Sequence, residues 1–177
     1  MEPLGPEDLR KLTIEEGLAL QKKIKRQPIY FILEDVLDTY NIGAFFRLAE
    51  AVAVNKLYLC GRTPTPPDGR IEKASVGSFK LVPWEYCEDV ASVVKELRQL
   101  KQVMIVAVEL HPKAVAYNKI NYKFPLALVF GSENYGMKSE TLQLADAITQ
   151  VPMYGLNRAL NVAVAAGIVA YHTLDNQ

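Results

Sequence analysis

Charge of one sign, cysteine and long apolar runs are all scarce in this chain, and each shortage narrows what the protein can be. Its 177 residues hold twenty basic and twenty acidic side chains, so there is no global electrostatic footprint for nucleic acid, although a local basic patch is enough to bind one. The two cysteines, Cys60 and Cys87, lack the spacing of a metal or redox motif, and we expect free thiols in a reducing cytoplasm. No apolar run approaches the ~20 residues of a membrane helix, and the first residues lack the layout of a signal peptide. The sequence therefore favours a cytoplasmic protein that does not enter a membrane.

What is present is the composition of one globular domain with a proper core, since half of the residues are hydrophobic and 23% are charged. We expect the main domain to span residues 28–177 and residues 1–27 to form a helical extension. Neither His111 nor His172 has an acid–base or metal-ligating partner in the sequence, so no metal site is expected.

The extension carries a helix-start signal. Thr13 and Glu16 form a T-x-x-E capping box, which predicts a helix over residues 14–26 that Pro28 ends. The basic end of this helix is either a solvated helix terminus or a contact to RNA phosphate. Because an isolated helix of this length is marginal, the extension should dock on the main domain or on a partner.

Short apolar runs alternate with helical patterns along the rest of the chain. The apolar runs predict strands over residues 29–33, 56–60, 79–84, 103–108, 125–130 and 147–151. The helical spacing predicts helices that cover residues 43–54, with Asn41 as a candidate N-cap, and residues 88–100, 138–145 and 160–174. Strands that are apolar throughout and separated by helices imply an α/β fold, with a mainly parallel sheet covered by helices on both faces.

Three loops could carry chemistry, because ligands of open α/β sheets sit beyond the carboxyl ends of the strands. They cover residues 34–47, 130–137 and 151–161. The second loop is bounded by Gly131 and Gly136, which allow a tight turn and close approach to a ligand. It matches neither a nucleotide P-loop nor a dinucleotide fingerprint, and on its own it could be an ordinary turn.

The last predicted helix is rich in alanine and valine on every side. A helix that is hydrophobic all round is buried all round. In so small a domain this suggests the sheet on one face and a second subunit on the other, hence a homodimer. The alternative is a helix sandwiched within one fold.

Taken together, the three loops resemble the motifs of the SpoU/TrmH family of RNA 2′-O-methyltransferases, which belongs to the SPOUT superfamily. The first motif, N-x-G-x-x-x-R, is matched by Asn41, Gly43 and Arg47. The second, a strand followed by G-x-E-x-x-G, is matched by Gly131, Glu133 and Gly136. The third resembles the stretch VPMYGLNRALNVAVA at residues 151–165. The motifs occur in the family's order, and the resemblance covers residues 28–174.

This resemblance implies a fold whose C-terminal segment forms a trefoil knot, and a homodimer with its active site at the subunit interface. It also implies that S-adenosylmethionine lies bent in the knot, held by the loops around Gly131, residues 148–153 and Leu160. The cofactor-binding residues implied in this way are Val108, Phe130, Gly131, Gly136, Ile148, Val151, Met153, Leu160 and Asn161.

The resemblance implies a catalytic group of Arg47, Asn41 and Glu133. Arg47 would capture the phosphate beside the target ribose, or act as the base in the family's own proposal, although a guanidinium is not expected to lose its proton. Asn41 would cap the helix and position Arg47 or contact RNA, and Glu133 would orient Arg47 or hold its own loop. The segment 69–80 resembles the family's flexible substrate loop, and a plain polar surface loop is the other interpretation. Its candidate RNA contacts are Arg70, Lys73 and Ser75.

The implied activity is methyl transfer from S-adenosylmethionine to a ribose 2′-hydroxyl of RNA, with tRNA the first candidate substrate and rRNA the second. The chain departs from the family pattern at Ala159 and Ala163, where serines are usual. Loss of a hydroxyl near the cofactor leaves open a second hypothesis, a knotted RNA-binding protein that no longer transfers methyl groups.

Overall fold

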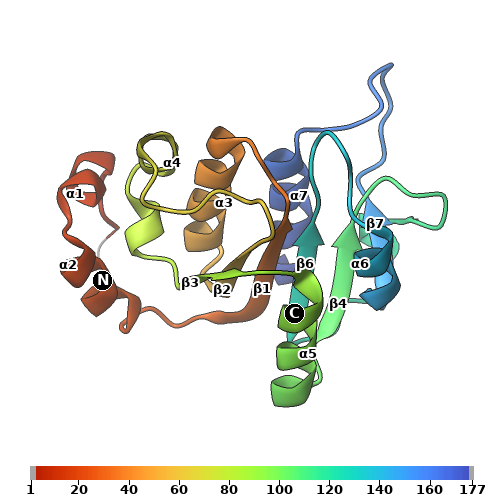
Figure 1. Ribbon diagram of the computed structural model, residues 1–177, viewed down its shortest axis with the longest axis horizontal. Helices are drawn as coiled ribbons and strands as arrows, with labels where there is room; N and C mark the ends of the chain where they lie inside the picture. The colour runs from red at the N-terminus through yellow and green to blue at the C-terminus, as the bar shows by residue number, and fades with distance from the viewer. Residues whose placement is uncertain (1–2, 176–177) are drawn as a thin grey trace.

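A single parallel sheet organises the chain in the computed structural model, which describes residues 3–175 apart from the side chains of residues 100 and 101 (Figure 1). Seven strands form the sheet in the order β3-β2-β1-β6-β4-β7-β5, and every neighbouring pair is parallel. The strands are β1 Gln27–Glu34, β2 Val54–Cys60, β3 Trp84–Cys87, β4 Met104–Val108, β5 Val115–Ala116, β6 Leu126–Phe130 and β7 Ala147–Gln150. The predicted α/β class with a parallel sheet is confirmed.

Helices cover both faces of this sheet, as the predicted strand pattern requires. They are α1 Pro6–Lys11, α2 Ile14–Gln21, α3 Thr39–Ala51, α4 Gly69–Ser75, α5 Val90–Lys101, α6 Ser139–Leu144 and α7 Val162–Asp175, with 3-10 turns η1 Ser78–Lys80 and η2 Tyr117–Lys119. Successive residues of β1 enter different cores, since Phe31 packs with α3 and α7 on one face and Ile32 packs with α5 on the other. Burial on both faces explains why β1 is a continuous apolar run. No helix of the described residues is long and apolar enough to cross a membrane.

Two predicted elements are wrong in position or kind. The segment 69–80 is not a loop, because Asp68 caps α4 with a carboxylate oxygen that accepts from the Arg70 and Ile71 amides. The strand predicted over residues 79–84 begins in the η1 turn, which ends at Lys80, and β3 begins only at Trp84. Apolar side chains of a short turn and of a short strand look alike in sequence, so periodicity could not separate them.

The extension differs from its prediction as well. The capping box of Thr13 and Glu16 is present and starts α2, but this helix already ends at Gln21. A separate helix, α1, precedes it, and the two-residue strand β5 was also missed. Both missed elements are too short to give a periodic signal.

The carboxyl end of the sheet has an unusual connection. Strand β7 pairs with β4 on one side and with β5 on the other, although β4 and β5 follow each other in the chain. The connection over residues 109–114 therefore crosses the end of β7. After β7, residues 151–161 rise away from the body of the molecule before the chain returns as α7, which packs against α3 (Figure 1).

Candidate active site at the carboxyl edge of the sheet

Three side chains from the three motif loops form one hydrogen-bonded chain. Asn161 Nδ2 donates to Asn41 Oδ1 at 2.8 Å, across 120 residues of sequence. Asn41 Nδ2 in turn donates to a carboxylate oxygen of Glu133. The structure thus brings together three of the residues singled out in the sequence.

Asn41 does not cap its helix, contrary to prediction. The N-cap of α3 is Asp38, whose Oδ1 accepts from the Tyr40 amide at 2.8 Å. Asn41 therefore lies inside the first turn, where its side chain is 8% exposed. A buried amide needs partners for both its donor and its acceptor, and Glu133 and Asn161 provide them.

Asn161 is the residue that starts α7. Its Oδ1 accepts from the amides of Ala163 at 2.9 Å and Val164 at 3.3 Å, which satisfies two of the free donors at the helix terminus. The same side chain thus fixes the beginning of α7 and, through Nδ2, ties that beginning to α3.

A cavity of about 370 Å³ opens beside this chain, within the size range of small-molecule sites. Its lining comes from the ends of β4, β6 and β7 and from the start of α7. The lining residues are Val108, Glu109, Leu110, Gly131, Ser132, Glu133, Gly136, Gln150, Val151, Ala159, Leu160, Asn161, Val162 and Ala165.

Six of the nine predicted cofactor residues line the cavity, namely Val108, Gly131, Gly136, Val151, Leu160 and Asn161. Phe130 does not, because its ring is fully buried in the core against Phe31 and Phe45. Ile148 packs in the second core on the α5 face, and Met153 lies outside the lining. The residues named from the sequence thus lie at the strand ends that form the cavity, but the sequence did not resolve which side chain of each end faces it.

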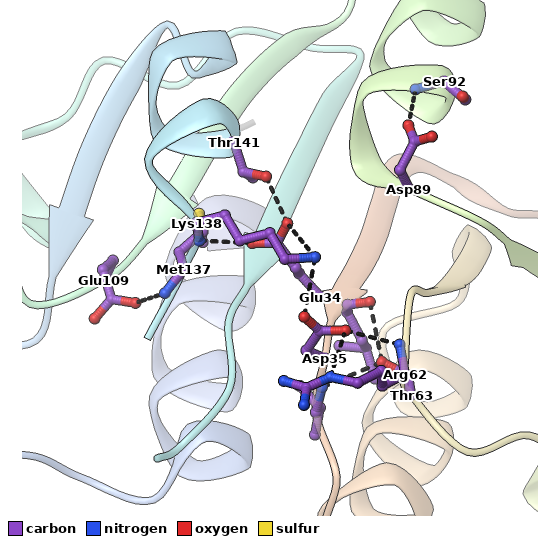
Figure 2. A network of polar contacts seen from close by, with 12 residues as sticks. Glu34, Asp35, Arg62, Thr63, Asp89, Ser92, Glu109, Met137, Lys138 and Thr141 are labelled. Atoms are coloured by element: carbon purple, nitrogen blue, oxygen red, sulfur yellow. Dashed lines mark hydrogen bonds and ion pairs between the residues drawn. The ribbon is translucent and has the colours of Figure 1, made fainter. Parts of the chain in front are cut away.

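The loop over residues 131–137 is folded tightly onto Glu109, a residue that the sequence analysis missed. Glu109 accepts from the Met137 amide through Oε2 at 2.9 Å (Figure 2). It also accepts from the Leu110 amide through Oε1 at 2.8 Å. Gly136 has a φ of +68°, and a Cβ on Gly131 would lie 2.8 Å from the Met137 nitrogen. Both glycines are therefore required for this turn, as expected. The only sequence signal for Glu109 was an acidic residue directly after a strand.

A second polar network holds the far side of the same loop. The buried Glu34 accepts from the Lys138 amide at 2.9 Å and from the Thr141 hydroxyl at 2.6 Å (Figure 2). Asp35 accepts from the Arg62 amide at 2.7 Å and pairs with Lys138 Nζ at 3.0 Å. Burial raises the pKa of Asp35, but the Arg62 amide and the Lys138 ammonium outweigh it and hold the pKa below its usual value. The loop is therefore braced from both sides.

Arg47 lies outside the cavity lining. Its side chain is exposed on α3, and within residues 3–175 it makes no hydrogen bond or ion pair. It follows Gly43 by one helical turn, and Gly43 packs so closely on α4 that a Cβ would lie 2.4 Å from the Ala74 Cβ. Arg47 is thus on the α4 side of α3 and is free to meet a ligand.

The predicted RNA contacts of α4 divide into two groups. Arg70 and Lys73 are exposed, and the Arg70 guanidinium makes a 3.5 Å contact with the Asp68 carboxylate. Ser75 is fully buried, and its hydroxyl donates to the Glu72 carbonyl at 3.1 Å. Ser75 is therefore not available to RNA, because the segment is a helix with an inner face and not a flexible loop.

The cavity fits a cofactor with a flat apolar part and a polar part. Val108, Leu110, Val151 and Leu160 supply apolar walls, while glycines leave the backbone of the 131–136 loop uncovered. This is the usual composition of a small-molecule site, with few polar groups among apolar ones. No cluster of three or more potential metal ligands occurs in the part of the chain that the structure describes.

The chain is similar to a family of RNA-methylating proteins and to individual members of that family. The model of the SpoU rRNA methylase family matches residues 28–171. A tRNA (guanosine(18)-2′-O)-methyltransferase of Aquifex aeolicus is 32% identical over 170 residues, which cover 89% of this chain and 78% of the relative. The corresponding protein of Thermus thermophilus is 31% identical over 167 residues, which cover 93% of this chain and 81% of the relative.

Two solved structures share the fold of this chain. The A. aeolicus TrmH/SpoU tRNA modifying enzyme superposes with a TM-score of 0.78 at 29% identity, over 93% of this chain and 84% of that one. An AdoMet-bound rRNA methyltransferase from Sinorhizobium meliloti superposes with a TM-score of 0.79 at 26% identity, over 88% of this chain. The match spans only 60% of the length of the S. meliloti chain.

Proposed function

Because this chain belongs to the SpoU rRNA methylase family, we propose that it transfers a methyl group from S-adenosylmethionine to a ribose 2′-hydroxyl of RNA. The observation that carries the proposal is the hydrogen-bonded chain from Glu133 through Asn41 to Asn161, which joins the three family motifs beside one cavity. The substrate is tRNA in the first place, since the A. aeolicus and T. thermophilus relatives are named as tRNA methyltransferases, and rRNA in the second.

The cavity is the cofactor site in this proposal. The apolar walls at Val151 and Leu160 would hold the adenine, and uncovered backbone groups around Gly131 would offer it hydrogen bonds. When bound, S-adenosylmethionine supplies an electrophilic methyl group on its sulfonium. Asn161 and Glu133 keep the two loops of the cavity in register through Asn41, so that a bound ligand meets a fixed geometry.

Arg47 has the role of a phosphate ligand. Its guanidinium stays protonated and offers a planar fork that matches a phosphate group. Its exposure on α3, outside the cavity, suits contact with the RNA backbone rather than with the cofactor. Glu133 has the role of orienting Asn41, because one of its carboxylate oxygens accepts from Asn41 Nδ2.

The finer features of the fold are part of the same proposal. A trefoil knot is supported by the insertion of β7 between β4 and β5, which leaves the 109–114 connection crossing the path toward α7. A homodimer is supported by exposed apolar side chains on the 151–161 segment and α7, namely Tyr154, Leu156, Leu160, Val164 and Tyr171. Large exposed apolar surfaces mark interaction sites. The proposed RNA substrates imply a cytoplasmic protein.

One observation favours a second candidate function. Ala159 lines the cavity where the family resemblance implies a serine, so the hydroxyl expected beside the cofactor is missing. A knotted RNA-binding protein without transfer activity would be compatible with this lining. Ser132, however, is in the same lining and supplies a hydroxyl from the neighbouring loop.

Calorimetric titration with S-adenosylmethionine, followed by methyl incorporation into tRNA and rRNA from a knockout strain, tests the proposal. We expect binding and incorporation into one RNA class. The absence of binding by folded protein at millimolar cofactor would refute the enzyme function. If the protein binds S-adenosylmethionine but does not incorporate methyl groups, and Ala159→Ser restores incorporation, the second candidate would be favoured.

Arg47 variants test the assigned role within the same assay. Arg47→Ala should abolish transfer while leaving cofactor affinity nearly intact, since the side chain lies outside the cavity. Arg47→Lys keeps the charge but loses the planar fork, so it should restore only part of the RNA affinity. A large loss of cofactor affinity in either variant would contradict the role.

A further inference from the structure

The N-terminal extension lies against the turn that follows α4, over residues 77–82. Figure 1 shows α1 and α2 beside α4, at the end of the molecule away from α5 and α6. Lys80 is at the centre of the contact, because its Nζ donates to the carbonyls of Arg10 at 3.1 Å and Leu12 at 2.8 Å. The ammonium thus satisfies carbonyls at the end of α1 and in the linker to α2.

The extension also bonds the backbone of this turn from the other side. Gln21 Nε2 donates to the Lys80 carbonyl at 2.9 Å and to the Val82 carbonyl at 3.3 Å. Arg26 Nη2 donates to the Leu81 carbonyl at 2.6 Å. Three consecutive carbonyls of the turn are therefore held by side chains of the extension and of the segment that joins it to β1.

Backbone packing makes the contact close and specific. A Cβ on Gly17 would lie 2.6 Å from the Lys80 carbonyl oxygen, and a Cβ on Gly77 would lie 2.4 Å from the Leu9 carbonyl oxygen. The preceding Val76 has a φ of +55°, a left-handed conformation that is unfavourable for a β-branched residue. Such a conformation persists only where the surroundings impose it, and the extension packs on the next residue, Gly77, through the Leu9 backbone.

The held turn leads directly to the exposed cations. Phe79, within the turn, packs edge-on against Phe46 of α3 with ring centroids 6.4 Å apart. Upstream of the turn, α4 carries Arg70 and Lys73 on its exposed side and rests on α3 at Gly43. A loosened turn would let α4 shift against α3, the helix that carries Arg47.

We propose that residues 6–26 are an internal clamp that positions α4, so that Arg70 and Lys73 lie beside Arg47 to receive RNA phosphates. Gln21 and Lys80 are positioning residues in this arrangement and do not touch the RNA themselves. The inference rests on the proposed function, because it assigns α4 to the RNA side of the site. In this proposal the basic end of the extension does not bind RNA phosphate directly. The extension instead acts by holding α4 in position.

Gln21→Ala is the most informative variant, since it removes two hydrogen bonds and no charge. Gln99→Ala on the exposed side of α5 is the matched control. We expect Gln21→Ala to raise the KM for RNA about fivefold, with kcat and cofactor affinity unchanged, because only substrate binding is lost. Amide hydrogen exchange of residues 77–82 should accelerate in Gln21→Ala and not in the control. Lys80→Met provides a second variant with the same expected pattern.

A double-mutant cycle decides whether the clamp acts through α4. In an Arg70→Gln, Lys73→Gln background, Gln21→Ala should no longer change the KM for RNA. A full effect in that background would overturn the proposal, as would an unchanged KM in both Gln21→Ala and Lys80→Met despite faster exchange of the turn. Failure of the unmodified protein to methylate any RNA would instead count against the proposed function. In that case RNA affinity, measured by fluorescence anisotropy in the same variants, would test the proposal that the extension positions α4.

Discussion

Replacement of Asn161 by alanine should weaken the fold and the cofactor site together. The variant loses the helix cap provided by Oδ1, which costs about 1 kcal/mol. It also loses the Nδ2 bond to Asn41, for which we assign about 0.5 kcal/mol because the Asn161 side chain is exposed to solvent. The free energy of unfolding should therefore fall by about 1.5 kcal/mol, a decrease in Tm of roughly 4 °C for a domain of this size.

Asn161→Asp separates the two contributions. The carboxylate can still accept from the Ala163 and Val164 amides, and a negative charge at a helix N-terminus is favourable. It cannot donate to Asn41, so the tie between α7 and α3 is lost. We expect nearly unchanged stability by urea denaturation but weaker binding of S-adenosylmethionine by calorimetry. Equal losses of stability in the two variants would refute the capping argument, and unchanged cofactor affinity in both would refute the role of the hydrogen-bonded chain.

Three further predictions rest on local geometry. Gly43→Ala should lower the free energy of unfolding by about 2 kcal/mol in urea denaturation, because the new Cβ would overlap Ala74. A loss below about 0.5 kcal/mol would contradict the close packing of α3 on α4. The lowered pKa of Asp35 adds stability above pH ~4, and this stability disappears as the pH falls through the folded pKa. Asp35→Asn should therefore lose less stability than the unmodified protein when the pH is lowered in urea denaturation. Equal losses of stability with falling pH in the two proteins would refute the pair of Asp35 with Lys138. Burial raises the pKa of the Cys60 thiol, so iodoacetamide at pH 7.5 should label it only after unfolding, and rapid labelling of folded protein would contradict its burial.

The sheet and most of its helices could be predicted because their signals are local. A buried parallel strand such as β6 is an apolar run that a glycine ends, and α5 shows an apolar face at helical spacing. Family membership could also be predicted, since the motif residues keep their order and spacing, and the family match over residues 28–171 confirms it.

The details of the site could not be predicted, because they depend on contacts between distant residues. Asn41 looked like an N-cap since asparagine favours that position, yet Asp38 occupies it and frees Asn41 to bond Glu133 and Asn161. Glu109 could not be recognised as the support of the 131–137 loop, since it lies 28 residues before Met137, whose amide it accepts from. Sequence spacing indicates which loops meet at one edge of a parallel sheet, but it does not tell which hydrogen bonds join them.

The arrangement around α3 is the reason why we expect mutations to separate RNA binding from cofactor binding. One edge of its buried face meets α7, through the bond from Asn161 to Asn41 and the packing of α7 against α3. The opposite edge meets α4 at Gly43 (Figure 1). The first edge adjoins the cavity, and the second adjoins the exposed cations of α4. Because a single helix spaces these edges, in the proposed function it would set the distance between a phosphate at Arg47 and a ligand in the cavity, and in-line transfer depends on such a fixed distance.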